Sequence, residues 1–242
     1  MSWGIVVSDY QYMRDKNILH RMETIRLHPA YKSLPDEILS KLAKKFHIIH
    51  FAKGEYIFHQ DDPSDNMYII ESGRVIVEKN ASSGKTFTFV VAVRGVTLNA
   101  VTCFKKSPRF LSARAVEKTT ILTTSCHDFS SWVIEHPEVT VETINILGTL
   151  LDGAYNRIID LIDESAEQRI LNALMMLFSR LGKNLPFTNM ELADMTGTSR
   201  ETAARVISRL QSANLLSKSR SQIEITDPDK LIELAGNHVF LV

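Results

Sequence analysis

The chain has 242 residues, enough for one large domain or two ordinary ones, each with its own core. Hydrophobic residues make up 44% and charged residues 23%, as in folded globular proteins, which excludes wholesale disorder. The 28 Lys and Arg side chains balance 28 Asp and Glu, so the net charge by itself indicates no nucleic-acid partner.

The chain shows no sign of a membrane span or a secretory leader. No apolar run reaches the roughly 18–20 residues that a bilayer requires, and residues 1–10 lack a basic leader with a long apolar stretch. Cys103 and Cys126 are far apart in the sequence, with no second thiol near either. This spacing favours a reducing compartment over a disulfide framework or a four-cysteine cluster. We therefore expect a cytoplasmic protein.

The first half of the chain predicts short helices followed by many short strands. Residues 1–30 form an N-terminal extension that we expect to be partly helical around Met22–His28, and Leu34–Phe46 has the pattern of an amphipathic helix. Glycines separate the runs that follow. Those runs are Phe46–Phe51, Tyr56–His59, Met67–Ile70, Arg74–Glu78, Thr86–Val93, Leu111–Val116 and Thr120–Thr124, with Gly54, Gly73, Gly84 and Gly95 at turns. This spacing predicts a β-sandwich or barrel-like roll.

At Pro137 the apolar period changes from two to about three and a half. Apolar side chains then alternate at spacings of three and four, the a/d pattern of a coiled coil. The predicted seam consists of Ile144, Leu147, Leu151, Ala154, Ile158 and Leu161. It favours a parallel homodimer. The alternative is one helix that packs its stripe on the neighbouring roll, although such a stripe is usually wider.

A second helix begins after the seam. Ser165 and Gln168 have the spacing of a capping box that starts a helix over Ala166–Leu181, so we place a hinge at Asp163–Ser165. The predicted domains are a sensor with its N-terminal extension over 1–136, a dimerisation helix and hinge over 137–164, and a third domain over 165–242.

Residues 188–211 have the pattern of a helix-turn-helix. Thr188 with Glu191 caps a short first helix, Gly197 allows a sharp turn, and Ser199 caps a second helix over 199–211. Its apolar positions lie on one face: Ala203, Val206, Ile207 and Leu210. Its opposite face holds Arg200, Glu201, Ala204, Arg205 and Ser208. A two-stranded wing over 214–225 follows.

These side-chain types suit a DNA major groove. Arginine can donate two hydrogen bonds to guanine, and glutamate can accept one from cytosine. Hydroxyl and basic groups suit phosphate contacts, for which the candidates are Ser199, Thr202, Lys218 and Arg220. The alternative is an ordinary solvated surface, since exposed arginines and Arg–Glu pairs are common on helices.

From about Leu34 to Leu234 the chain resembles the cyclic-AMP receptor protein/fumarate-nitrate regulator (CRP/FNR) family. The matching segments are residues 57–73, the long helix, and Thr198-Ser-Arg-Glu-Thr-x-x-Arg205. The resemblance implies an α+β protein with a cyclic-nucleotide-binding-like β-roll, a long dimerisation helix and a C-terminal winged helix-turn-helix. It also implies a homodimer whose Arg200, Glu201 and Arg205 contact bases in palindromic TGTGA-like half-sites, with RNA polymerase as a further partner.

The resemblance does not extend to the residues that bind cyclic nucleotides. The family's Gly-Glu pair corresponds to Asn99-Ala100, its Arg-Ser/Thr-Ala to Leu111-Ser112-Ala113, and its purine contacts to Ala154-Tyr155. We therefore expect an effector other than cyclic AMP, or none, although a loop slip could bring Arg109 into the missing place. The candidate effector pocket between roll and long helix consists of Asn99, Arg109, Ser112, Ala154 and Tyr155.

Other cofactors and classes have less support. Iron–sulfur sensing would need N-terminal cysteines, and residues 1–50 contain none; His47 and His50 point to opposite faces of a strand, so no metal site is predicted. A haem remains open, and Cys103 is a small buried hydrophobe more often than a ligand or redox switch. The alternatives are a haem- or redox-responsive member of the family, or an adaptor without DNA binding. We expect no enzyme, since no nucleophile motif is present.

Overall fold

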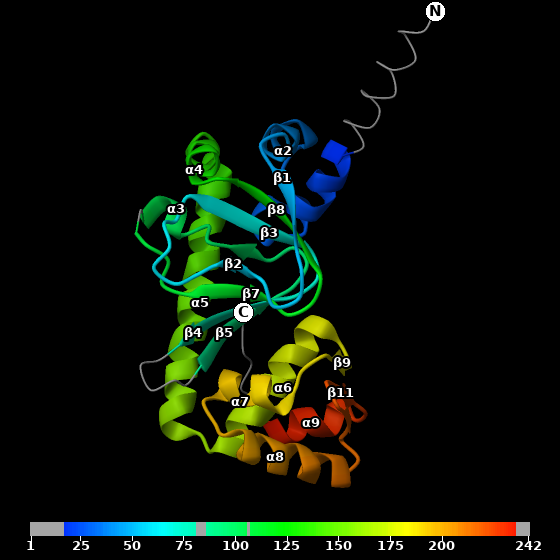
Figure 1. Cartoon of the computed structure of the whole chain (residues 1–242). Coiled ribbons are helices and arrows are strands. Elements are labelled where there is room, and N and C mark those ends of the chain that lie inside the picture. Colours follow the sequence, from blue (N-terminus) through cyan, green and yellow to red (C-terminus); the bar gives the residue numbers. More distant parts are fainter. Residues whose placement is uncertain (1–16, 81–85, 106, 236–242) are drawn as a thin grey trace, which may run out of the picture. The chain divides into compact units, whose positions relative to one another are not determined.

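The computed structural model describes residues 17–80, 86–105 and 107–235 (Figure 1). They belong to two compact units. The first lies within Met1–Lys79 and Phe89–Ile146, the second within Asn80–Thr88 and Leu147–Val242, and the long helix α5 (Pro137–Asp163) contributes to both. No described helix is both long and apolar enough to cross a bilayer. The fold is α+β, with a β-roll, a long helix and a C-terminal winged helix-turn-helix, as predicted.

Two four-stranded antiparallel sheets form the roll. One has the order β1-β8-β3-β6 and the other β2-β7-β4-β5. The strands are β1 (His47–Phe51), β2 (Tyr56–Phe58), β3 (Asn66–Ser72), β4 (Val75–Asn80), β5 (Thr86–Ala92), β6 (Thr97–Leu98), β7 (Ser112–Ala115) and β8 (Thr119–Ser125). Both sheets contribute buried side chains to one cluster, including Phe58, Ile70, Val75 and Ile121.

All seven predicted runs form strands, with bounds shifted by at most two residues; β6 was not predicted. Gly73 is required at its turn, because its φ is +86° and a Cβ there would lie 2.5 Å from Thr119 Oγ1. Gly84 lies outside the described residues.

Helices cover a second core in the first unit. Residues 17–26 are helical and are followed by η1 (Pro29–Tyr31) and α2 (Asp36–Ala43), so the helix expected around Met22–His28 includes residues 17–26 and the amphipathic helix is shorter than predicted. Residues 1–16 of the extension lie outside the described residues. α3 (Thr102–Lys105) and α4 (Cys126–Ile134) were not predicted. Tyr31, Leu39, Phe46, Phe129 and Trp132 are among the buried side chains that join these helices to the roll.

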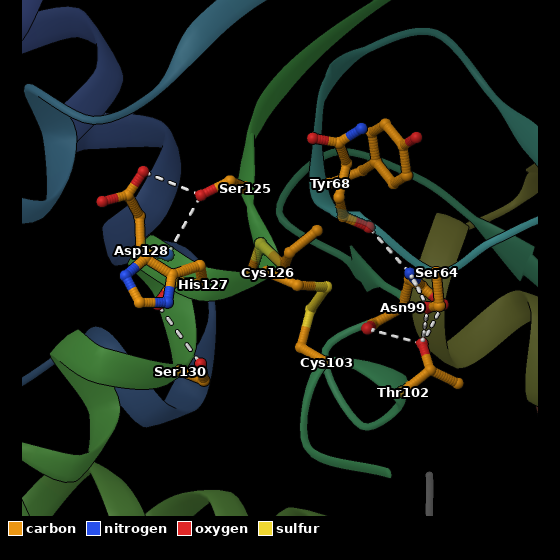
Figure 2. Close-up of a disulfide and its surroundings, with 12 residues drawn as sticks. Ser64, Tyr68, Asn99, Thr102, Cys103, Ser125, Cys126, His127, Asp128 and Ser130 are labelled. Carbon is orange, nitrogen blue, oxygen red and sulfur yellow. Dashed lines mark hydrogen bonds between the residues drawn. A yellow bond between two sulfur atoms is a disulfide. The ribbon is translucent and has the colours of Figure 1, made fainter. Parts of the chain in front are cut away.

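The expectation that the two cysteines lie apart is wrong. Cys103 in α3 and Cys126 at the start of α4 form a disulfide with a Cα–Cα distance of 4.8 Å (Figure 2). Their 23-residue separation in sequence is closed because α3 packs against α4 at the end of β8. The cysteine spacing is therefore no argument for a reducing compartment.

The second unit contains α6 (Ala166–Leu181), β9 (Asn184–Leu185), α7 (Asn189–Thr196), α8 (Arg200–Ser212), β10 (Leu216–Ser219), β11 (Gln222–Ile225) and α9 (Pro228–Ala235). The wing has three strands in the order β10-β11-β9, not two, because Asn184–Leu185 pairs with β11. Ser165 caps α6 as predicted, but the Gln168 side chain donates to Ala235 O and Asn172 Oδ1, so the capping box is incomplete.

Most seam residues of α5 are exposed within the single chain. Ile144, Leu151, Ile158 and Leu161 expose 61%, 51%, 53% and 45% of their surface. Ala154 is exposed as well, and Leu147 is half-buried. Burying such apolar area against a partner is favourable by about 25 cal/mol per Å².

Candidate nucleic-acid interface and effector site

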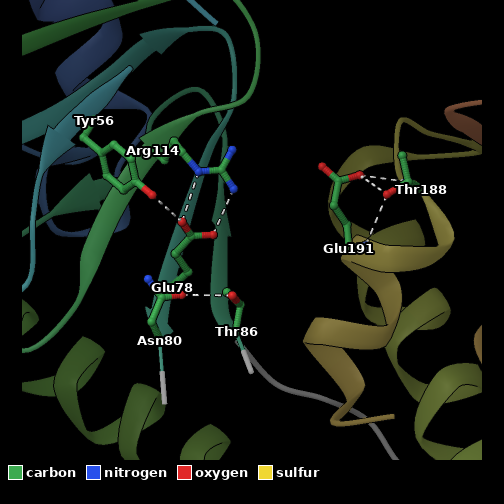
Figure 3. Close-up of polar contacts among 7 residues, drawn as sticks. All are labelled: Tyr56, Glu78, Asn80, Thr86, Arg114, Thr188 and Glu191. Carbon is green, nitrogen blue, oxygen red and sulfur yellow. Dashed lines mark hydrogen bonds and ion pairs between the residues drawn. The ribbon is translucent and has the colours of Figure 1, made fainter. Parts of the chain in front are cut away.

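Local sequence determines the turn of the helix-turn-helix. Thr188 Oγ1 accepts from Glu191 N, and Glu191 Oε2 accepts from Thr188 N at 2.7 Å, so the predicted capping box is complete (Figure 3). Gly197 ends α7 in the left-handed conformation, with φ +63° and ψ +34°. A Cβ at Gly197 would lie 3.1 Å from Leu161 Cδ2, so the turn also approaches the end of α5 closely.

Helix α8 has the two faces that the sequence predicted. Ala203, Val206, Ile207 and Leu210 are buried. The opposite face exposes Arg200, Glu201, Arg205 and Ser208, with Ala204 half-buried. Hydrogen bonds from its own backbone and from Ser199 lower the pKa of Glu201, so its carboxylate is ionised and available as an acceptor.

The four phosphate candidates differ in their surroundings. Ser199 Oγ caps α8 by accepting from Thr202 N at 3.1 Å, and the Ser199 and Thr202 hydroxyls bond to each other. Arg220 is exposed in the wing. Lys218, however, donates from Nζ to Phe187 O at 2.9 Å, and burial lowers its pKa. Lys218 therefore fastens the wing to the segment before α7.

Two arginines that sequence reasoning missed attach α7 to its neighbours. Arg157 in α5 donates to Met195 O at 2.6 Å, and Arg169 in α6 donates to Thr196 O at 2.9 Å. Both carbonyls belong to the last turn of α7, where cations are favoured. Burial lowers the pKa of Arg157. These bonds orient the helix-turn-helix on α5 and α6, and neither residue has a neighbouring motif that reveals this role.

Arg109 is buried inside the roll, where it is 4% exposed. Its guanidinium lies 4.1 Å from the centre of the Phe58 ring, and its Nε donates to Pro63 O at 3.0 Å. Its Nη2 is 3.4 Å from the Tyr68 hydroxyl, while Nη1 has no hydrogen-bond partner. Burial lowers its pKa, and Tyr68 opposes that effect. The sequence left open whether Arg109 reaches the interior of the roll, and the structure buries it there.

Of the other effector candidates, Asn99 and Ser112 make hydrogen bonds within the roll, and Ala154 and Tyr155 belong to the other unit. Asn99 has φ +70° and donates to Ser64 Oγ and Asn66 O, both at 2.7 Å, while Ser112 Oγ accepts from Gln60 N. Both side chains shape loops of the roll. Ala154 and Tyr155 belong to the second unit, where both are exposed. A pocket that combines them with the roll stays a prediction.

An ion pair between a half-buried arginine and a buried glutamate joins strands of the roll. Arg114 donates from Nε and Nη2 to the two carboxylate oxygens of Glu78, each at 3.0 Å, and Tyr56 donates to the same carboxylate (Figure 3). Glu78 raises the pKa of Arg114. Among the described residues, no three His, Cys, Asp or Glu side chains are grouped as around a metal ion.

Comparisons with known proteins agree with this architecture. The family model "Cyclic nucleotide-binding domain" matches residues 48–136, and "Crp-like helix-turn-helix domain" matches residues 168–234. The chain is 22% identical over 213 residues to the CRP-like cAMP-activated global transcriptional regulator of Mycobacterium tuberculosis. The aligned region covers 85% of this chain and 95% of that protein. It is 26% identical over 208 residues to the cyclic AMP receptor protein of Thermus thermophilus, at 86% and 96% coverage.

Among solved structures, FixK2 from Bradyrhizobium japonicum superposes with a TM-score of 0.72 at 18% identity, covering 80% of this chain and 99% of that one. A β-roll of the cyclic-nucleotide-binding type followed by a Crp-like helix-turn-helix defines a DNA-binding transcription regulator. The chain belongs to the CRP/FNR family.

Proposed function

We propose that the chain acts as a homodimer that binds palindromic operators with TGTGA-like half-sites. The observation that supports this is the arrangement on α8, where Arg200, Glu201 and Arg205 are exposed opposite a fully buried apolar face. Arg200 and Glu201 lie in the first turn of the helix, the part that enters the major groove in helix-turn-helix proteins. The three side chains offer both donors and an ionised acceptor to base edges. Ser199, Thr202 and Arg220 would contact phosphates, with Lys218 nearby.

Helix α5 supports the dimer. Its exposed seam repeats at three and four residues, which suits a second copy of the same helix in parallel. Two α8 helices related by the dimer axis would then meet successive major grooves about 34 Å apart. The predicted division at 137–164 makes this helix and its hinge the connection between sensor and DNA-binding part. Such a protein would work in the cytoplasm with RNA polymerase as a partner and without catalytic activity.

The roll would take an anionic effector. Arg109 Nη1 is a buried donor without a partner, and such a donor costs free energy unless a ligand or water accepts from it. A carboxylate or phosphate group would both accept the hydrogen bond and neutralise the guanidinium. Ala100, at the position of the family's ribose-binding carboxylate, has no side-chain acceptor, and Oδ1 of the neighbouring Asn99 already accepts from Thr102 Oγ1. We therefore infer an anion other than cyclic AMP.

A gel-shift titration on a TGTGA-type palindrome tests the DNA-binding proposal. We expect salt-sensitive binding that Arg200→Ala weakens by about 1–3 kcal/mol, with relaxed preference at one base position. The control is Lys230→Ala, an exposed cation on α9, which should leave both affinity and preference unchanged. Unaltered base preference in Arg200→Ala would reject the role given to Arg200.

A further inference from the structure

The disulfide lies beside the loop that holds the arginine of the roll. Cys103 is 5% exposed and belongs to the core beneath α4, whereas Cys126 is half-buried and opens α4. α4 is firmly anchored, since Phe129, Trp132 and Val133 are buried. α3, by contrast, is one turn of four residues following the two-residue strand β6. The disulfide therefore attaches a short segment to a rigid one.

A polar cluster joins that short segment to residues 61–66. Ser64 Oγ accepts from Asn99 Nδ2 and donates to Thr102 Oγ1, both at 2.7 Å, and Thr102 also bonds to Asn99 (Figure 2). The backbone N–H of Cys126 donates to Asp65 O at 2.7 Å. Cys126 thus bonds directly to Asp65, and Cys103 follows Thr102, which bonds to Ser64.

Residues 61–63 of the same segment form hydrogen bonds with Arg109. Asp61 N donates to Arg109 O at 2.8 Å, Arg109 N donates to Asp62 O at 3.0 Å, and Arg109 Nε donates to Pro63 O. Residues 61–66 therefore connect the disulfide directly to the buried guanidinium. A change at the disulfide can reach Arg109 through this one segment of six residues.

We propose that Cys103 and Cys126 form a reversible thiol–disulfide site that sets how tightly the Arg109 site holds an anion; the anion part of this inference rests on the proposed function above. The oxidised form fixes residues 99–105 and 61–66, and with them the guanidinium. Reduction leaves residues 99–105 tied to residues 61–66 through the Ser64–Asn99–Thr102 cluster and the Asn99–Asn66 hydrogen bond, without the covalent link to α4, so the anion site loosens.

Glutathione and its disulfide are the reductant and oxidant of this exchange. A glutathione thiolate attacks the more accessible Cys126 Sγ, the Sγ–Sγ bond breaks, and Cys103 leaves as a thiolate and takes a proton. A second glutathione then displaces Cys126, which yields two protein thiols and glutathione disulfide. In the reverse direction Cys126 attacks glutathione disulfide first, and its place at a helix N-terminus favours the thiolate it needs.

The first experiment measures the exchange itself. The folded full-length protein is equilibrated in glutathione buffers of graded ratio, quenched with acid, and labelled with a polyethylene-glycol maleimide. We expect two thiols at the reducing end, none at the oxidising end, and a two-electron transition between them. A bond that resists reduction in the folded protein at every ratio would overturn the proposal.

The second experiment measures the coupling. Hydrogen exchange of residues 97–105 and 61–66 should accelerate at least about fivefold on reduction, while amides of α8 keep their rates. Sulfate, titrated at constant ionic strength against the melting temperature, should bind about tenfold more weakly to the reduced form. Cys126→Ser is the matched control, because it should behave as reduced in every buffer.

The outcomes separate the two proposals. Thiols that exchange without any change in these amides or in sulfate affinity would refute the coupling. Sulfate that binds neither form would refute the anion site, and the accelerated exchange of residues 61–66 would still support the switch. The wild-type titrations decide the matter even if the serine variant fails to fold.

Discussion

The stability of the ion pair between Glu78 and Arg114 depends on both of its partners. The Glu78 side chain is only 6% exposed, so its carboxylate relies on Arg114 and Tyr56 in place of water. Removing the cation would leave a buried charge whose solvation nothing replaces.

We expect Arg114→Met to destabilise the protein by about 3 kcal/mol, and the double variant with Glu78→Met to recover most of that loss. Urea unfolding of the three proteins measures it. Lys41→Met, which removes the exposed pair with Glu37, should cost at most about 0.5 kcal/mol and serves as the control. Equal losses at the two sites would contradict the burial argument.

His28 makes stability depend on pH. Burial lowers its pKa from 6.5 to about 4, and its Nδ1 accepts a hydrogen bond from Ala30 N, which requires an unprotonated nitrogen. The unfolded chain binds the proton more readily, so this contribution to stability is present above pH 6.5 and is lost as the pH falls toward 4.

Unfolding free energies at about pH 7 and pH 5 should therefore differ by about 2 kcal/mol more in the wild type than in His28→Gln. Denaturant titrations of both proteins at the two pH values measure this difference. A variant with the same pH dependence as the wild type would show that His28 is not the group responsible.

At the scale of elements, the spacing of apolar residues along the sequence was enough to predict the helices α5 and α8. The seam of α5 and the buried face of α8 follow from the positions of apolar residues along the chain; the buried face of α8 is confirmed, and the seam stays a prediction. Of the missed elements, α4 has nine residues and several others are short. α3 and β9 have four and two residues, too few to show a period, and tertiary contacts stabilise them.

Leu151→Lys should break the predicted seam. A charge at an a position would be buried against its own copy, so we expect monomers that cannot hold a palindrome at nanomolar protein. Sedimentation velocity measures the association. Asn156→Lys, an exposed position of α5 outside the seam, should remain dimeric. A dimeric Leu151→Lys protein would reject the coiled-coil interpretation.

At the scale of the whole molecule, the proposed function depends on two recognition helices acting together. Each α8 offers only three base-contacting candidates, which is little specificity for one half-site. A dimer adds the two half-sites and requires that both face the same side of the duplex.

Inserting about five base pairs, half a helical turn, between the half-sites should therefore reduce affinity to that of a single half-site. Inserting about ten should restore part of it, since the half-sites again face the same side. Gel shifts on the three duplexes measure the effect. Affinity that does not depend on spacing would argue for binding by separate protomers.

The sequence by itself determined the roll, the long helix and the helix-turn-helix, and the order of these three parts along the chain. Period, glycine turns and capping residues such as Thr188 and Glu191 are local signals, and the local structure they favour is the one that forms. The same local reasoning put Arg200, Glu201 and Arg205 on one face of the second helix, and the resemblance to the family gave them the role of base contacts.

Only the tertiary structure decided which distant residues meet. It joined Cys103 to Cys126, placed Arg109 in the roll, and set Arg157 and Arg169 on the last carbonyls of α7. Each of these contacts closes a loop of 23 or more residues, and the packing of whole elements selects it. No property of either residue's neighbours in sequence specifies such a partner.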